Sequence, residues 1–411
     1  REKMDEHYIQ NNYLVNSDSV DLINASYDPK IYCGTDKDFI ECYHTLMNTD
    51  PTSVYFFDYI KKKFDILNLV DYFIVEIYSG NRDWLNNGAN NLKLWRSQNT
   101  NGKWRYLLYD ADAAFWMYPY DDSFQSALDP LRPNKHSDLF LKFLENPNFR
   151  CMFGKRFMEL VSTIFEIDNV YMNIDSLRNG IYDAMPHHIN KWGQPISMLE
   201  WESEIEEIKD YVINRRDSIT NDLLQYINAS SIISLDFNVI PIESGDIKIN
   251  DALINQYPSN RLYLEDLCAD TLIAIADSGF IFSHWNSTHI IGRQIYNDTI
   301  NIDLYQNDTI VANFRECRIN NLYLNQDSIY NIFSPIFDVG YGPYSFQWFL
   351  DNDTIIAAED SLIYPVMTGF YSVSVTDKDG CNTISPSVFF DCNILVESDL
   401  TQDTITNSLH I

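Results

Sequence analysis

Residues 81–115 read NRDWLNNGANNLKLWRSQNTNGKWRYLLYDADAAF, and no other stretch of the chain brings together so many polar side chains of chemical use. Asp83 is followed by a run of amide side chains, namely Asn86, Asn87, Asn90 and Asn91. An aromatic and apolar run over 104–109 then predicts a strand that ends on Asp110 and Asp112. The block therefore predicts a β element that presents carboxylates and amides, set in a part of the chain whose pattern is otherwise helical.

The order of these polar groups is that of a base followed by metal ligands. Phosphoryl transfer relies on positioning and charge neutralisation: one carboxylate accepts the proton of the attacking hydroxyl, while an amide and a second carboxylate hold Mg²⁺ through oxygen atoms. This order predicts Asp83 as the base and Asn91 and Asp110 as the metal ligands. Because side chains two residues apart share one side of an extended chain, Asp112 is expected to support Asp110.

The same block resembles the CotH kinase family, a group of atypical kinases named after a spore-coat protein. The opening residues 1–6, REKMDE, resemble a further segment of that family, and the resemblance extends over about residues 1–230. Within the central block it rests on Asn81, Asp83, Trp84, Asn90, Asn91, Lys93, Trp95, Arg96, Gly102, Lys103, Trp104, Arg105, Tyr109, Asp110, Asp112 and Phe115.

The resemblance implies that residues 1–230 form the larger, mostly helical lobe of an α+β atypical protein kinase. It implies transfer of phosphate from ATP to a Ser or Thr hydroxyl of a protein substrate, with Mg²⁺ or Mn²⁺ as cofactor. Asp83 would be the catalytic base, and Asn91, Asp110 and Asp112 would hold the metal. The residues assigned to the nucleotide are Asn90, Asn91, Lys93 and Arg96.

Two departures from the family pattern bear on these assignments. Residues 86–88, Asn-Asn-Gly, stand between the Asp-Trp pair and the Asn pair as extra residues, so either Asn87 or Asn91 can be the metal amide. We favour Asn91 because it directly precedes the Leu-Lys-Leu-Trp-Arg run. We expect the nucleotide-binding lysine and its strands upstream of Arg1, since the chain has no glycine-rich phosphate loop.

Each assignment has an alternative. Asp83 can cap a helix, an Asp-x-Asp pair also occurs in glycosyltransferases and calcium loops, and Lys93 and Arg96 can pair with carboxylates instead of phosphate. A glycosyltransferase would need a doubly wound sheet, which the helical pattern disfavours. For the whole protein, the alternative to a kinase is a catalytically inactive surface scaffold or adhesion protein that binds partners through the kinase-like lobe and the β modules.

Charge excludes some classes of partner. The chain has 59 acidic and 29 basic residues and a net charge of −30. Nucleic acids and anionic membrane surfaces attract basic proteins, so neither is expected as a partner. No apolar run approaches the length of a transmembrane segment. We expect a protein that is secreted or held at a bacterial cell surface.

Seven cysteines leave two readings open. Local pairing would join Cys33 to Cys42, Cys268 to Cys317 and Cys381 to Cys392, leaving Cys151 free; such bonds would suit an oxidising compartment. The other reading is scattered buried thiols. No Cys-x-x-Cys pair indicates a zinc site.

Composition changes near residue 230, and the change predicts a multidomain protein. Apolar residues at helical spacing predict helices over 64–78, 137–167 and 199–227. Beyond this point turn signals alternate with short apolar runs, and only six of the 29 basic residues lie from 235 onward. The pattern predicts small all-β modules.

Two such modules are expected. Residues 235–317 resemble a divergent internalin-type B-repeat, and residues 318–395 resemble a PKD-like or immunoglobulin-like sandwich, with Trp348 as its core tryptophan. Residues 396–411 are a polar tail or the start of a further module. The β modules are the expected binding sites for cell-surface or glycan partners.

Overall fold

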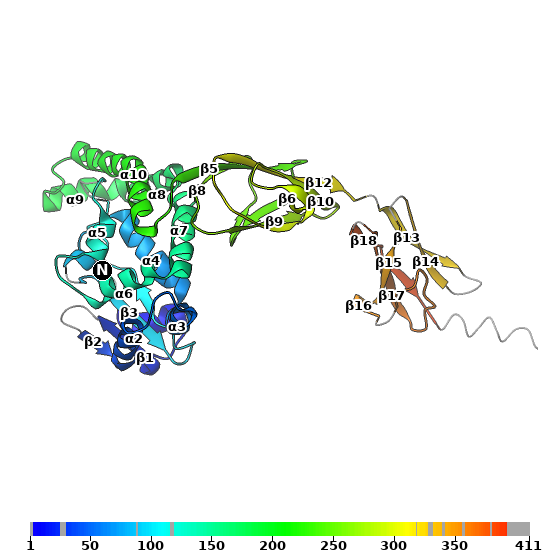
Figure 1. Cartoon of the computed structure of the whole chain (residues 1–411), viewed down its shortest axis with the longest axis horizontal. Coiled ribbons are helices and arrows are strands. Elements are labelled where there is room, and N and C mark those ends of the chain that lie inside the picture. Colours follow the sequence, from blue (N-terminus) through cyan, green and yellow to red (C-terminus); the bar gives the residue numbers. More distant parts are fainter. Residues whose placement is uncertain are drawn as a thin grey trace, which may run out of the picture. The chain divides into compact units, whose positions relative to one another are not determined.

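The computed structural model describes residues 3–24, 30–87, 89–115, 119–317, 319–327, 332–338, 342–355, 358–378 and 380–392 (Figure 1). The resemblance at Arg1 and Glu2, the extra residue Gly88 and the tail over 396–411 lie outside the described residues, and of Asn87 only the backbone is described.

Contacts divide the chain into two units. The first contains Arg1–Leu235, Asn260–Asp270 and Asp303–Asp308; the second contains Asp236–Ser259, Thr271–Ile302 and Thr309–Ile411. A multidomain protein with a helical part and small β-sheets is therefore confirmed. The finer ranges 1–230, 235–317 and 318–395, and the B-repeat and PKD or immunoglobulin resemblances, stay predictions.

The first unit is mainly helical. Its α-helices are α1 (Glu6–Tyr13), α2 (Lys37–Met47), α3 (Val54–Lys63), α4 (Ile66–Ser79), α5 (Ser123–Leu128), α6 (Lys135–Glu145), α7 (Pro147–Val161), α8 (Ile167–Ile181), α9 (Met185–Trp192) and α10 (Met198–Ile227). Short 3₁₀ turns are η1 (Ser17–Ser19), η2 (Leu85–Asn87) and η3 (Tyr182–Ala184). No helix in the described part of the chain is both long and apolar enough to cross a membrane.

The three predicted helical stretches are confirmed, and local chemistry fixes where they start. Asp65 caps α4 by accepting a hydrogen bond from the Asn68 amide. The stretch 137–167 forms α6, α7 and the start of α8, because Asn146 and Pro147 end one helix and begin the next. Ser197 caps α10 by accepting from the Glu200 amide at 3.1 Å.

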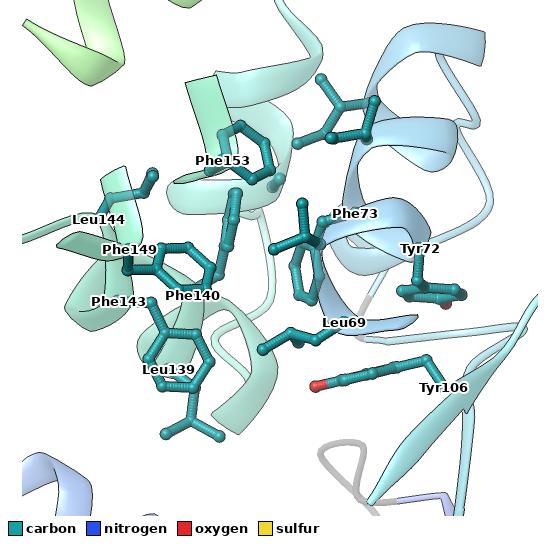
Figure 2. Packing of buried hydrophobic residues seen from close by; sticks show 14 of the residues in the cluster. Leu69, Tyr72, Phe73, Tyr106, Leu139, Phe140, Phe143, Leu144, Phe149 and Phe153 are labelled. Carbon is teal, nitrogen blue, oxygen red and sulfur yellow. The ribbon is translucent and has the colours of Figure 1, made fainter. Parts of the chain in front are cut away.

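Aromatic residues of α4, α6 and α7 form the core of this unit (Figure 2). Phe73 of α4 stacks on Phe140 of α6, with ring centroids 4.2 Å apart. Phe140 in turn meets Phe153 of α7 edge-on at 5.3 Å. Burying each such ring contributes about 1.5–3 kcal/mol relative to leaving it exposed. This packing makes α4 a rigid support for the residues that follow it.

A four-stranded antiparallel sheet lies beside these helices. Its order is β2-β1-β3-β4, and its strands are β1 (Val20–Asn24), β2 (Lys30–Cys33), β3 (Lys93–Ser97) and β4 (Arg105–Leu107). The predicted strand over 104–109 is therefore shorter than expected, and it ends before Asp110. Because this sheet is antiparallel, it gives no support to the doubly wound glycosyltransferase alternative.

The remaining strands are β5 (Ile232–Ile240), β6 (Gly245–Ile249), β7 (Ala252–Ile254), β8 (Ser259–Leu264), β9 (Asp270–Ala276), β10 (Phe280–Asn286), β11 (Thr299–Ile302), β12 (Asp308–Glu316), β13 (Asn320–Asp327), β14 (Ile332–Asp338), β15 (Ser345–Leu350), β16 (Asp353–Thr354), β17 (Gly369–Thr376), β18 (Asn382–Ile384) and β19 (Val388–Phe390), with the 3₁₀ turn η4 (Gly292–Tyr296). They form sheets of order β10-β12-β5-β8, β11-β9-β6-β7, β13-β14 and β16-β15-β17-β18, with β19 on β17. Trp348 of β15 is fully buried, as expected of a core tryptophan.

The cysteine pairing differs from both readings of the sequence. Cys151 of α7 is bonded to Cys268, and Cys317 to Cys381, whereas Cys33, Cys42 and Cys392 are free. All three local pairs were wrong, and Cys151 is not free. Pairing depends on which Cα atoms the fold brings within about 7 Å, and not on nearness in sequence. Here the two Cα separations are 6.1 and 5.4 Å.

Candidate active site

The site begins where α4 ends. Gly80 takes a left-handed backbone, with φ of 63°, and its amide donates to the carbonyls of Glu76 and Ile77. A side chain at Gly80 would meet the Tyr211 hydroxyl at 2.4 Å, so two constraints favour glycine here. The chain then turns sharply into Asn81–Trp84, the start of the motif block.

Asp83 is held by hydrogen bonds from both sides of the sequence. Its Oδ2 accepts from the Nδ2 atoms of Asn90 at 2.8 Å and Asn91 at 2.9 Å. Its own backbone amide donates to Asn81 Oδ1 at 3.2 Å. Asp83 is half-buried, so it is both oriented and open to solvent. The structure thus brings Asp83, Asn90 and Asn91 together.

Asn91 also connects Asp83 to the second carboxylate segment. Its Nδ2 lies 3.3 Å from the backbone oxygen of Asp83 and 3.4 Å from that of Asp110. Asn91 and Asp110 both adopt left-handed backbones, with φ of 47° and 55°. Such conformations are uncommon for residues other than glycine, and they gather at functional sites because the surrounding contacts must hold them.

Asp110 and Asp112 do not lie on an extended strand. The left-handed backbone of Asp110 breaks the alternation, and Asp112 falls in the turn that follows. The expectation that a shared strand face aligns their carboxylates was therefore wrong. Asp112 instead lines a groove of about 770 Å³, together with Phe115 and the α10 residues Glu207 and Tyr211.

The donor types, an amide and two carboxylates, are those that bind a hard cation. Asn91 uses its amide nitrogen on Asp83, which leaves its amide oxygen as the atom able to bind a metal, and Asp110 and Asp112 add carboxylate oxygens. Among the described residues no group of three or more His, Cys, Asp or Glu side chains is placed to hold a metal. A cation here would depend on this mixed set of amide and carboxylate ligands, whose role stays a prediction.

Lys93 and Arg96 make contacts away from Asp83. Lys93 is buried in β3, donates to the Met4 carbonyl at 2.7 Å, and has its Nζ over the rings of Tyr32 and Tyr109. Burial lowers the pKa of its ammonium group. Arg96 pairs with Asp21 and Asp38, both at 2.8 Å. For Arg96 these contacts are the carboxylate pairs expected from the sequence as the alternative to phosphate binding. Binding of nucleotide by Lys93 or Arg96 stays a prediction.

Glu76 was not recognised from the sequence as part of the site. It is an acidic residue within α4, yet it is only 1% exposed. Its Oε2 accepts from Asn81 Nδ2 at 2.8 Å. Burial raises the pKa of its carboxyl to about 7, against the opposing effect of hydrogen bonding from Asn81 and Tyr72. The helical period alone gave no signal, because the motif loop folds back over this side of α4.

A second missed feature is a clamp from α10. Arg215 is fully buried, and burial lowers the pKa of its guanidinium. It donates to backbone carbonyls at the end of α4 and to the segment that follows Asp112; the acceptors are Ile77, Tyr78, Pro119, Asp121 and the Ser123 hydroxyl, at 2.7 to 3.0 Å. One turn earlier, the Tyr211 hydroxyl donates to the Ser79 carbonyl at 3.1 Å. Carbonyls that α4 cannot satisfy internally thus receive donors from α10.

Comparison with known proteins identifies the family of this chain. A family model described as CotH kinase protein matches residues 1–219, more than half of the 411 residues. A search of curated proteins finds no match. The matched range includes Asp83, Asn91, Asp110 and the clamp residue Arg215. The chain therefore belongs to the CotH kinase family.

Proposed function

We propose that the protein transfers the terminal phosphate of ATP to Ser or Thr hydroxyls of a protein substrate. The observation that carries this proposal is the contact set of Asp83, in which Asn90 and Asn91 orient the carboxylate and Asn91 also reaches Asp110. Family membership supports a kinase-like activity. The identity of the acceptor as Ser or Thr is part of the proposal.

In the proposed reaction Asp83 accepts the proton of the attacking hydroxyl. Two amide donors on Oδ2 hold its carboxylate in one orientation, which reduces the entropy lost on reaching the reactive geometry. Asn91 Oδ1, Asp110 and Asp112 would hold Mg²⁺ or Mn²⁺, which when bound neutralises charge on the phosphate oxygens. The left-handed backbones at Asn91 and Asp110 are strain that this role would explain.

A second proposal concerns location. We infer that the protein is secreted or displayed at the cell surface, because disulfides such as Cys151–Cys268 and Cys317–Cys381 persist in oxidising compartments. Binding of surface or glycan partners by the β modules remains a prediction from sequence resemblance.

The decisive test of the transfer reaction is incorporation of labelled phosphate from ATP, by the full-length protein, into a degenerate Ser/Thr peptide library, with Mg²⁺ and with a chelator. The proposal expects Mg²⁺-dependent labelling that disappears when Ser and Thr are replaced by Ala in the library. No labelling by folded protein, together with no binding of ATP, would favour the alternative of an inactive surface scaffold or adhesion protein.

A further inference from the structure

The base Asp83 is flanked by two anchored residues of its own motif. Asn81 precedes it and bonds Glu76, whereas Trp84 follows it and donates from Nε1 to the Tyr72 hydroxyl at 2.9 Å. Tyr72 and Glu76 lie four residues apart on α4, so they occupy the same face one turn apart. Residues on both sides of the base, Asn81 and Trp84, are therefore bonded to a single helix face.

That helix face is itself fixed by packing. Tyr72 stacks on Tyr106 of β4, with centroids 4.7 Å apart and an interplanar angle of 18° (Figure 2). Phe73, its neighbour, stacks on Phe140 in the aromatic core. The Tyr72 and Glu76 side chains are almost wholly buried. A displacement of the base relative to α4 must therefore break one of the two anchoring hydrogen bonds.

The Asn81 side chain transmits the position of Glu76 to Asp83. Its Nδ2 donates to Glu76 Oε2 and its Oδ1 accepts from the Asp83 amide, so the amide group bridges the two residues. An asparagine side chain can rotate by half a turn and exchange its oxygen and nitrogen. An acceptor at Glu76 selects the orientation in which the oxygen faces the Asp83 amide.

A buried carboxyl group in this place is costly, and packing alone would favour an apolar residue. Glu76 Oε1 makes no hydrogen bond within the described part of the chain. The titratable groups facing Glu76 are the hydroxyls of Tyr72 on α4 and Tyr109 after β4, and neither is a cation. No described ion pair compensates the group, and the hydrogen bonding that offsets its burial comes from Asn81 and Tyr72.

We propose that Glu76 is a positioning residue for the phosphotransfer base, acting through Asn81 to hold the backbone of Asp83 in its reactive place. The inference rests on the proposed kinase function for its catalytic consequence, but the contact itself does not. In the described part of the chain the hydrogen bonds of Glu76 go to Asn81 and Tyr72 and not to the predicted metal ligands, so its effect is on geometry.

The variants that test it are Glu76→Ala, which removes the acceptor, and Glu76→Gln, which keeps an acceptor oxygen for Asn81. We expect Glu76→Ala to lower kcat about 100-fold, the effect of about 1 Å of misplacement, with KM for ATP little changed. Glu76→Gln should restore kcat. Val70→Ala, a core substitution on the same helix that leaves the Glu76–Asn81–Asp83 hydrogen bonds in place, controls for loss of stability: it should lower the melting temperature while kcat stays unchanged.

A second readout separates this inference from the proposed function. Hydrogen exchange of peptides overlapping 80–85 should be faster in Glu76→Ala, unchanged in Glu76→Gln and unchanged in Val70→Ala. If the wild type transfers no phosphate but this exchange pattern appears, the kinase proposal fails and the positioning of Asp83 stands. If Glu76→Ala leaves exchange at 80–85 unchanged, or if Glu76→Gln is as impaired as Glu76→Ala, the positioning role is overturned.

Discussion

At the scale of single residues, the orientation of Asp83 depends on three asparagines. Asn90 and Asn91 donate to its carboxylate, and Asn81 accepts from its backbone amide. The side chains of this part of the motif thus bind one another. An amide in place of the Asp83 carboxylate would preserve the size of the side chain but remove its capacity to accept a proton.

The first prediction concerns that capacity. Asp83→Asn should lower the rate of phosphate transfer by about 10²–10⁴-fold, the usual contribution of a general base, while Mg²⁺-dependent ATP binding persists. Asp58→Asn, at an exposed site whose ion pair with Lys61 contributes little, is the matched control and should keep the wild-type rate. Full activity of Asp83→Asn would remove Asp83 from the role of base.

The second prediction concerns the pH dependence of stability. The pKa of Glu76 is raised from 4.5 to about 7, so the folded state favours the neutral form. The neutral Glu76 carboxyl makes its full contribution to the free energy of unfolding below pH 4.5. As the pH rises towards 7 that contribution is lost, which lowers the free energy of unfolding by about 3 kcal/mol in all. Glu76→Gln cannot ionise and should not show this loss.

Urea unfolding of both proteins between pH 4 and 8 measures the difference, in which titrations common to the two chains cancel. The free energy of unfolding of Glu76→Gln should increase relative to that of the wild type as the pH rises. A constant difference across this range would show that Glu76 ionises normally in the folded protein.

Residues of the motif were predictable because chemistry and order are visible in sequence. Asp83, Asn90 and Asn91 lie within eight residues and do come together. Glu76 was not predictable, since its burial depends on a loop folding back over α4. The alignment of Asp110 with Asp112 was wrong because a left-handed residue interrupts the expected strand.

At the scale of secondary structure, α4 and α10 together determine the geometry of the site. The end of α4 exposes carbonyls that its own helix cannot satisfy, and α10 supplies Arg215 and Tyr211 to them. Arg215 reaches the segment after Asp112 at the same time. The helices were predictable from the spacing of apolar residues. The clamp was not, because a single buried arginine leaves no periodic pattern in the sequence.

The third prediction follows from this clamp. Arg215→Met should lower the free energy of unfolding by about 3 kcal/mol or more, because several buried carbonyls lose their donor together. Arg215→Lys should fall between methionine and wild type, since an ammonium lacks the planar fork of a guanidinium. Chemical denaturation measures both.

The control is Arg178→Lys, a partly exposed residue that pairs with Glu202 of α10 and should change stability by less than about 1 kcal/mol. Equal stability of Arg215→Met and the wild type would mean that Arg215 does not bridge α4 and the loop.

At the scale of the whole molecule, covalent links join residues far apart in the chain. The Cys151–Cys268 bond ties α7 to the segment Asn260–Asp270, which contacts place in the first unit although it follows residue 235 in sequence. Two further contacts strengthen this attachment. The Leu262 amide donates a hydrogen bond to Ser162 Oγ at 2.8 Å, and Lys155 forms an ion pair with Asp270 at 3.0 Å. Sequence could not show this, because the fold alone brings the two cysteines together.

The fourth prediction tests that link. Replacing Cys151 and Cys268 by Ser should lower stability by about 2–5 kcal/mol, as removal of a bond that closes a long loop does. Peptide mapping of the unreduced protein should find Cys151–Cys268 and Cys317–Cys381, and alkylation should label Cys33, Cys42 and Cys392. A linkage between Cys33 and Cys42 would contradict the pairing.

The measurement that tests the central claim most directly is calorimetric titration of ATP into the full-length protein with and without Mg²⁺, beside the Asp110→Ala variant of the same protein. Asp110→Asn is the folding control, because asparagine adopts the left-handed backbone of Asp110 more readily than alanine does. The account predicts binding by the wild type that requires Mg²⁺ and is lost in Asp110→Ala while that variant remains folded. Binding of equal strength in wild type and variant, or no binding by folded wild-type protein, would contradict a metal–nucleotide site in the 81–115 block.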